Sequence, residues 1–130
     1  MFKITPVQDV TTAAECCRIC GRDYVPGAFV YAMRDCDTDD LMGICQFEIL
    51  GSCGYIYSLT SVPDTDDFEA MFILGRQAMN FIDLCGTHEC RADPKCDDSD
   101  MLRAIGFKES SNMLICDMRG MFDGSHCSGH

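Results

Sequence analysis

Cysteine is unusually frequent among the residues that could do chemistry, since the 130-residue chain has eleven cysteines. Cys17 and Cys20 form a C-x-x-C pair, a spacing found in zinc and redox sites. A zinc site needs a second such pair or suitably spaced histidines, and the sequence has no second C-x-x-C. Both thiols also fall on the apolar stripe of an expected helix, so we expect them to pack in the core as small, soft side chains.

Histidine and cysteine are close together in the sequence at two further places. His88 and Cys90 lie two residues apart in an expected strand at 87–92, so their side chains should face the same side. His126, Cys127 and His130 could chelate a metal ion, but only after a polar, glycine-rich chain end is ordered. We favour a packing role for the first pair and expect no resident metal at the second group.

Acid–base residues lie on two adjacent expected strands, at 41–50 and 55–62. Glu48 could act as a general base, and Tyr55 and Tyr57 share one face and could contact a substrate. The alternatives are a solvated glutamate on a strand face and two tyrosines that pack against a helix. Sequence alone does not decide between these roles.

Apolar periodicity predicts the elements that must position these side chains. We expect strands at 2–5, 28–34, 41–50, 55–62, 87–92, 107–109 and 113–118, and helices at 13–20, 68–85 and 99–105. Three successive strands with short turns predict an antiparallel meander, and Gly75 in the buried stripe of the long helix permits close approach to a sheet. The order of elements predicts an α+β domain with a mixed, largely antiparallel sheet flanked by helices.

Length and composition limit the classes of function. At 47% hydrophobic residues, the chain can form one domain with its own core, which we place at 1–119, followed by a short polar tail at 120–130. The net charge of −11 argues against nucleic acid and against an anionic membrane surface as partners. Acidic turns at 37–40 and 97–100 are expected to be solvated. The odd number of cysteines, with no export signal, favours reduced thiols in the cytosol.

Two short motifs carry a family resemblance. Leu59 and Pro63 match an L-x-x-x-P strand ending, and Gly106-Phe107 match a late G-F pair beyond the long helix. With these motifs in this order, the chain resembles the GNAT superfamily of N-acyltransferases over most of its length. The resemblance implies a GNAT-like sheet in which two central strands splay apart, and acyl-CoA that inserts between them to acylate an amine.

The resemblance also implies a position for the cofactor. It assigns cofactor-binding backbone groups to Ser61 and Val62, at the end of the strand before Pro63. The family loop that follows, Q/R-x-x-G-x-G/A, wraps the pyrophosphate with free amides at a helix N-terminus. Here its Q/R and small-residue positions are occupied by Asp66, Glu69 and Met71. Carboxylates at this loop repel an anion, so the pyrophosphate loop is degenerate.

Two functions therefore remain open. The first is a GNAT-like N-acetyltransferase that uses acetyl-CoA to acylate a small-molecule amine. Many members use a tyrosine to protonate the leaving thiolate, and Leu102 stands at that position, so no catalytic residue is assigned. The second is a non-catalytic module of the same fold that binds another small ligand or a protein partner. A metal- or thiol-based sensor is a third alternative, and a homo-oligomer is compatible with each.

Overall fold

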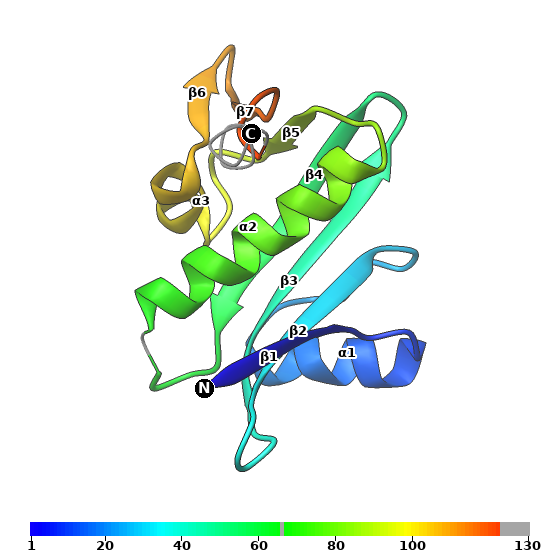
Figure 1. The fold of residues 1–130 in the computed structure, drawn as a ribbon, viewed down its shortest axis with the longest axis vertical. Helices are drawn as coiled ribbons and strands as arrows, with labels where there is room; N and C mark the ends of the chain where they lie inside the picture. Colours follow the sequence, from blue (N-terminus) through cyan, green and yellow to red (C-terminus); the bar gives the residue numbers. More distant parts are fainter. Residues whose placement is uncertain (66, 123–130) are drawn as a thin grey trace, which may run out of the picture.

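The computed structural model describes residues 1–65 and 67–122. Its strands form one mixed sheet in the order β1-β2-β3-β4-β5-β7-β6, with helices packed on both faces (Figure 1). The elements are β1 (Phe2–Pro6), α1 (Val10–Ile19), β2 (Phe29–Asp35), β3 (Leu41–Leu50), β4 (Cys53–Ser61), α2 (Phe68–Leu84), β5 (Glu89–Ala92), α3 (Ser99–Ile105), β6 (Lys108–Ser110) and β7 (Met113–Asp117). The α+β class and the order of elements predicted from the sequence are confirmed.

The connections determine the direction of each strand. Strands β2, β3 and β4 follow one another through short turns and pair antiparallel, which confirms the predicted meander, and β1 pairs antiparallel with β2 although α1 lies between them in the chain. The long helix α2 then carries the chain back across the sheet, so β5 pairs parallel to β4. Strand β7 pairs antiparallel with β5 on one side and with β6 on the other, so β6 forms that edge of the sheet.

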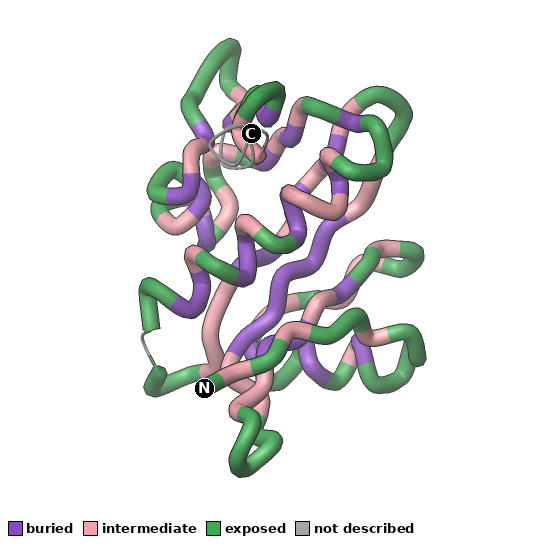
Figure 2. The backbone as a smooth tube through the Cα atoms, viewed as in Figure 1, coloured by how far each residue is buried: buried purple, intermediate pink, exposed green. Residues whose placement is uncertain are grey.

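The main core lies between the sheet and α2. Alternate residues of the central strands, among them Met33, Cys45 and Phe47, point to this face and are fully buried. Figure 2 shows this buried run along β3 and β4, while the turns are exposed. Two glycines allow α2 to approach closely, because Gly43 faces Met71 and Gly75 faces the Leu59 side chain. The close approach predicted for Gly75 is confirmed.

A smaller core fills the other face, beneath α1. Asp9 caps this helix by accepting a hydrogen bond from the Thr12 amide at 2.9 Å. The helix then buries the predicted stripe against Val30 of β2 and Ile44 of β3; the stripe residues are Ala13, Cys16, Cys17 and Cys20. Packing is therefore the role of the C-x-x-C thiols in this structure.

Two boundaries differ from the sequence-based expectation. Gly54, expected in a turn, lies within β4 and pairs with Cys90, because its missing side chain leaves room for Ile82 and Cys90. His88 precedes β5 instead of lying within it. His88 is exposed, whereas Cys90 is fully buried in the main core, so the expectation that they share a face is wrong.

The end of the described chain returns to the core. Met121 and Phe122 are partly buried and pack against the main cluster. His126, Cys127 and His130 lie outside the described residues, so the proposed boundary between 1–119 and 120–130 stays a prediction. Within the described ranges, no helix is both long enough and apolar enough to cross a membrane.

Replacement of Gly43 by alanine should destabilise the protein. The added Cβ would lie 2.5 Å from Met71 Cε and 2.7 Å from the Thr60 carbonyl oxygen, which belongs to the paired strand and cannot move aside. Overpacking of this kind costs about 1–3 kcal/mol, measurable by urea denaturation. Gly75→Ala is the matched control, because its Cβ would meet only the flexible ends of Leu59 and Ile105. Equal losses in both variants would contradict this account.

Candidate functional site

Strands β4 and β5 separate in the middle of the sheet. They pair at Gly54–Cys90 and Tyr55–Arg91, after which β5 ends at Ala92 while β4 continues to Ser61. The later part of β4 therefore faces the segment that leads into α3 instead of a strand. We call this region the β4–β5 gap.

A carboxylate from the α3 segment reaches into the β4–β5 gap. Asp98 Oδ2 accepts a hydrogen bond from the Leu59 amide at 3.0 Å. Arg22 donates to the same carboxylate twice, from Nη2 to Oδ1 at 2.6 Å and from Nε to Oδ2 at 3.1 Å. Asp98 is only 6% exposed, and these three donors compensate for its loss of water. The gap is thus closed at Leu59 by a side chain of the protein itself.

The expectation that the acidic turn at 97–100 is solvated is wrong for Asp98. Asp97 beside it is exposed and lies 4.0 Å from Arg22, as expected of a loop residue. Asp98 differs because it stands at the N-cap position of α3, where the chain passes beneath the end of β4. Because the acidic residues of this turn are similar, the sequence alone does not indicate which of them is buried.

The loop between α1 and β2, residues 20–28, is fixed by a buried amide. Gln46 of β3 is fully buried, accepts from the Val25 amide at 2.6 Å and donates to the Asp23 carbonyl at 3.0 Å. These bonds hold the loop over the sheet and bring Arg22 within reach of Asp98. The roles of Gln46 and Arg22 were not predicted from the sequence, since a lone glutamine in an alternating strand is typical of a solvent-facing position.

An acid–tyrosine pair lies beside the gap on the α1 face. The Tyr57 hydroxyl donates to Glu48 at 2.7 Å, and burial, with a further contribution from Glu48, raises the pKa of Tyr57 to about 12. The rings of Tyr55 and Tyr57 are in contact, with centroids 5.0 Å apart and planes tilted by 45°, so the expectation that these two tyrosines share a face is confirmed. Tyr55 and Tyr57 line a cavity of about 350 Å³ with Asp93.

The two residues expected to bind a cofactor lie at the end of β4 and differ in their backbone partners. Ser61 follows Leu59 by two residues, so its amide points to the same side as the Leu59 amide, into the gap. The Ser61 hydroxyl donates to the Thr65 carbonyl at 2.7 Å. The Val62 amide donates to the Met42 carbonyl at 2.9 Å, and its own carbonyl accepts from Thr65 at 3.2 Å. Binding by these groups stays a prediction.

The start of α2 presents acids where a pyrophosphate would need amides. Asp67 caps the helix and accepts from the Ala70 amide at 3.0 Å, so a carboxylate already occupies this terminus. Glu69 follows in the first turn and is exposed, while Met71 turns inward against Gly43. Asp66 lies outside the described residues.

Basic residues are also missing from this part of the sequence, since positions 62–75 contain no lysine or arginine. Coenzyme A carries several phosphate charges and needs donors at this loop. The residues at the gap and at the start of α2 therefore do not fit coenzyme A bound in the usual way.

The other candidate groups identified in the sequence lie apart from the gap. Burial raises the pKa of Cys17 to about 11 and that of Cys20 to about 12, so neither thiol ionises readily near neutral pH. His88 Nδ1 lies 2.5 Å from Asp83 Oδ1 near the surface. Leu102 is fully buried in the main core. Among the described residues, no group of three or more His, Cys, Asp or Glu side chains could hold a metal ion.

Solved structures resemble this fold closely. The ribosomal-protein-S18-alanine N-acetyltransferase of Escherichia coli matches with a TM-score of 0.70 and 8% identity, over 91% of this chain and 94% of that one. The PaiA N-acetyltransferase of Thermoplasma acidophilum, in complex with coenzyme A, matches with a TM-score of 0.68 and 12% identity, over 90% and 99%. N-acetylglutamate synthase of Neisseria gonorrhoeae matches with a TM-score of 0.70 and 12% identity, but this chain covers only 35% of it.

These matches show the fold of the GNAT N-acetyltransferases, as the strand and turn motifs predicted. No protein-family model matches the sequence, and no curated protein matches it. At identities this low, the likeness concerns the fold and leaves the chemistry to the residues of the site.

Replacement of Arg22 by alanine should destabilise the protein, because it removes the ion pair in the β4–β5 gap. Arg22→Ala leaves Asp98 buried with one donor fewer on each oxygen, and loss of one partner of a buried pair costs about 3 kcal/mol. Urea denaturation measures this loss. Arg18→Ala is the control, because Arg18 pairs with Glu15 at the exposed surface of α1 and should contribute nothing measurable. Equal stability of the two variants would contradict a buried role for Asp98.

The raised pKa of Tyr57 makes the stability of the folded protein depend on pH in the alkaline range. The pKa is shifted from 10.0 to about 12 in the folded protein, so the unfolded chain ionises first as the pH rises. The stabilisation is complete below pH 10 and is lost between pH 10 and about pH 12. Tyr57→Phe should remove the highest-pH step from the phenolate absorbance titration and weaken this alkaline loss. An unchanged titration would place Tyr57 in an ordinary environment.

Proposed function

We propose that this protein is a non-catalytic ligand-binding module built on the N-acetyltransferase fold. The single observation that carries the proposal is the Asp98 carboxylate on the Leu59 amide, inside the gap that receives a cofactor in proteins of this fold. A pantetheine arm that paired with β4 there would have to displace Asp98. Displacement would leave Arg22 without its main partner in a half-buried position.

Electrostatics at the mouth of the gap support the same conclusion. Asp64, Asp67 and Glu69 are exposed around the start of α2, in a chain of net charge −11. A helix N-terminus contributes only about 0.3–1 kcal/mol to anion binding, which several carboxylates can cancel. A phosphate-bearing cofactor is therefore disfavoured twice, by the closed gap and by the acidic loop.

The proposed ligand is a small amine, bound in its cationic form beside Tyr55 and Tyr57. The faces of tyrosine rings attract a cation, and desolvation strengthens the attraction. Glu48 and Asp93 add negative charge nearby; burial, followed by the charge on Asp93, raises the pKa of Tyr55. The cavity of about 350 Å³ is large enough for a compact amine. The cytosolic location and the oligomeric state expected from the sequence remain predictions.

Thermal unfolding with acetyl-CoA tests the proposal. Ligand at 100 times its dissociation constant stabilises by about 2.7 kcal/mol, which gives a clear rise in Tm. We expect no rise for this protein with millimolar acetyl-CoA, and a rise for the E. coli ribosomal-protein-S18-alanine N-acetyltransferase as positive control. A rise in this protein that Ser61→Pro abolishes, while the fold is retained, would overturn the proposal.

A GNAT-like N-acetyltransferase is the second candidate, favoured by the separation of β4 from β5 and by the Glu48–Tyr57 pair beside it. A carboxylate at that place could take a proton from an ammonium ion. Incubation with acetyl-CoA and a panel of amines, followed by mass spectrometry of the amines, distinguishes the two. Acetylated product that disappears in Glu48→Gln would establish the enzyme and reject the binding module.

A further inference from the structure

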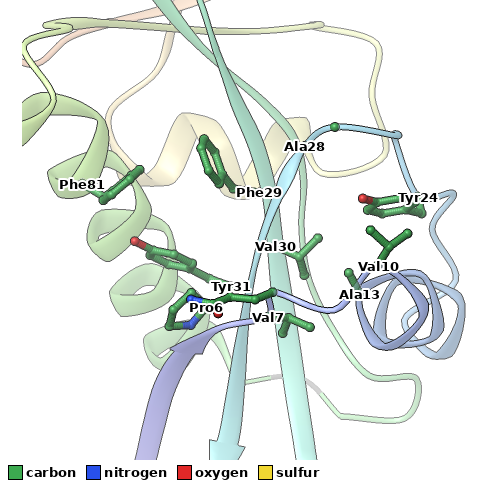
Figure 3. Close-up of a pocket in the computed structure, with 12 residues that line it drawn as sticks. Pro6, Val7, Val10, Ala13, Tyr24, Ala28, Phe29, Val30, Tyr31 and Phe81 are labelled. Carbon is green, nitrogen blue, oxygen red and sulfur yellow. The ribbon is translucent and has the colours of Figure 1, made fainter.

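A cavity that the candidate site does not use lies away from the gap, at the end of β1. It encloses about 550 Å³ between the edge of β2, the C-terminal half of α2 and the start of α1 (Figure 3). Strand β1 ends at Pro6, and the Val7 amide then donates to the Val30 carbonyl at 2.8 Å as the chain turns toward α1. The edge of β2 beyond Val30 is left uncovered, which opens the cavity.

One wall of the cavity is aromatic. Phe29, Tyr31 and Phe81 lie together on the left of Figure 3. Phe29 meets Phe81 edge-on with centroids 5.6 Å apart, and buried Phe47 supports Phe29 and Tyr31 from behind at 5.4 and 5.1 Å. Ring contacts of this kind fix the side chains and make a firm surface for another ring.

The opposite wall of the cavity is aliphatic, except for the ring and hydroxyl of one tyrosine. Val10 and Ala13 of α1 form it with Tyr24 from the loop before β2. Val10 is 63% exposed and Phe29 is 46% exposed, so two large apolar side chains meet water at the mouth. Contiguous apolar surface of this kind marks binding sites more often than isolated exposed residues do.

Charge complementarity selects the class of occupant. None of the residues that line the cavity is charged, although 24% of the chain is charged and the net charge is −11. None of these residues offers a basic group to an anion or a carboxylate to a cation. Polar contacts come from the Tyr24 and Tyr31 hydroxyls and the Gln8 amide, which suit a neutral ligand with one or two polar atoms.

We propose that this cavity binds a neutral, largely aromatic small molecule, stacked against Phe29 and Phe81 with a polar atom toward the Tyr24 hydroxyl. Its volume lies in the range of small-molecule sites, roughly 300–1,000 Å³. The site is independent of the amine cavity, which lies beside β4. The ligand would touch Tyr24, Gly27 and Ala28, which belong to the same loop that Arg22 ties to Asp98.

Binding of N-phenyl-1-naphthylamine, a neutral aromatic probe whose emission rises in apolar surroundings, tests the proposal. We expect saturable binding at one site per chain. Phe29→Ala should weaken the probe about tenfold, since it removes a ring from the wall. Phe68→Ala is the matched control, because Phe68 is a similarly exposed phenyl at 56%, placed at the start of α2 away from the cavity. This variant should leave binding unchanged.

A charged analogue tests the neutrality of the site. The anionic probe 8-anilinonaphthalene-1-sulfonate should bind at least tenfold more weakly than the neutral one. Equal effects of the two alanine variants, tighter binding of the anionic probe or no saturation would each overturn the proposal. Concentration-dependent dimerisation that Phe29→Ala abolishes would overturn it as well, and would assign this face to a second copy of the chain.

Discussion

The Asp98 carboxylate joins three parts of the chain that are far apart in sequence. It accepts from Arg22 in the loop after α1, accepts from the Leu59 amide of β4, and itself begins α3. A buried charge is tolerated only where donors replace water, so each of these parts must stay in place for the others to do so. These contacts hold the loop after α1, the later part of β4 and the start of α3 together where β4 and β5 separate.

Most of the fold could be predicted from local patterns. Alternation in 41–50 gives β3, and the stripe from Phe68 through Gly75 gives α2, since periodicity of apolar residues depends only on neighbours in sequence. The predicted boundaries are wrong where a contact with a residue far away in the sequence determines the local structure. Gly54 reads as a turn residue, yet it lies in β4 because Ile82 and Cys90 occupy the space of its missing side chain.

The candidate site was less accessible to sequence reasoning. Tyr55, Tyr57 and Glu48 could be placed on adjacent strands, but their hydrogen bond depends on the register of β3 against β4. The acidic loop before α2 was evident from composition and argued against a phosphate from the start. The burial of Asp98 was not evident from the sequence. An acidic run in a loop is solvated unless a basic residue from another part of the chain pairs with it, and Arg22 lies 76 positions away.

Strand β4 contains one more residue than the part of β3 with which it pairs, and this affects where the strand can lose a residue. The pairing shifts so that Gln46 faces Ser58 while Phe47 faces Ile56, which leaves Tyr57 as the inserted residue of a β-bulge. Deletion of that one residue would make Gln46–Ser58 and Phe47–Ile56 consecutive pairs of a regular ladder, with Ile56 still beneath α2, and would remove the hydroxyl that donates to Glu48. The loss of one residue is therefore better tolerated at this bulge than at a regular position of β4, where it would turn part of the strand over and bring side chains now beneath α2 into water.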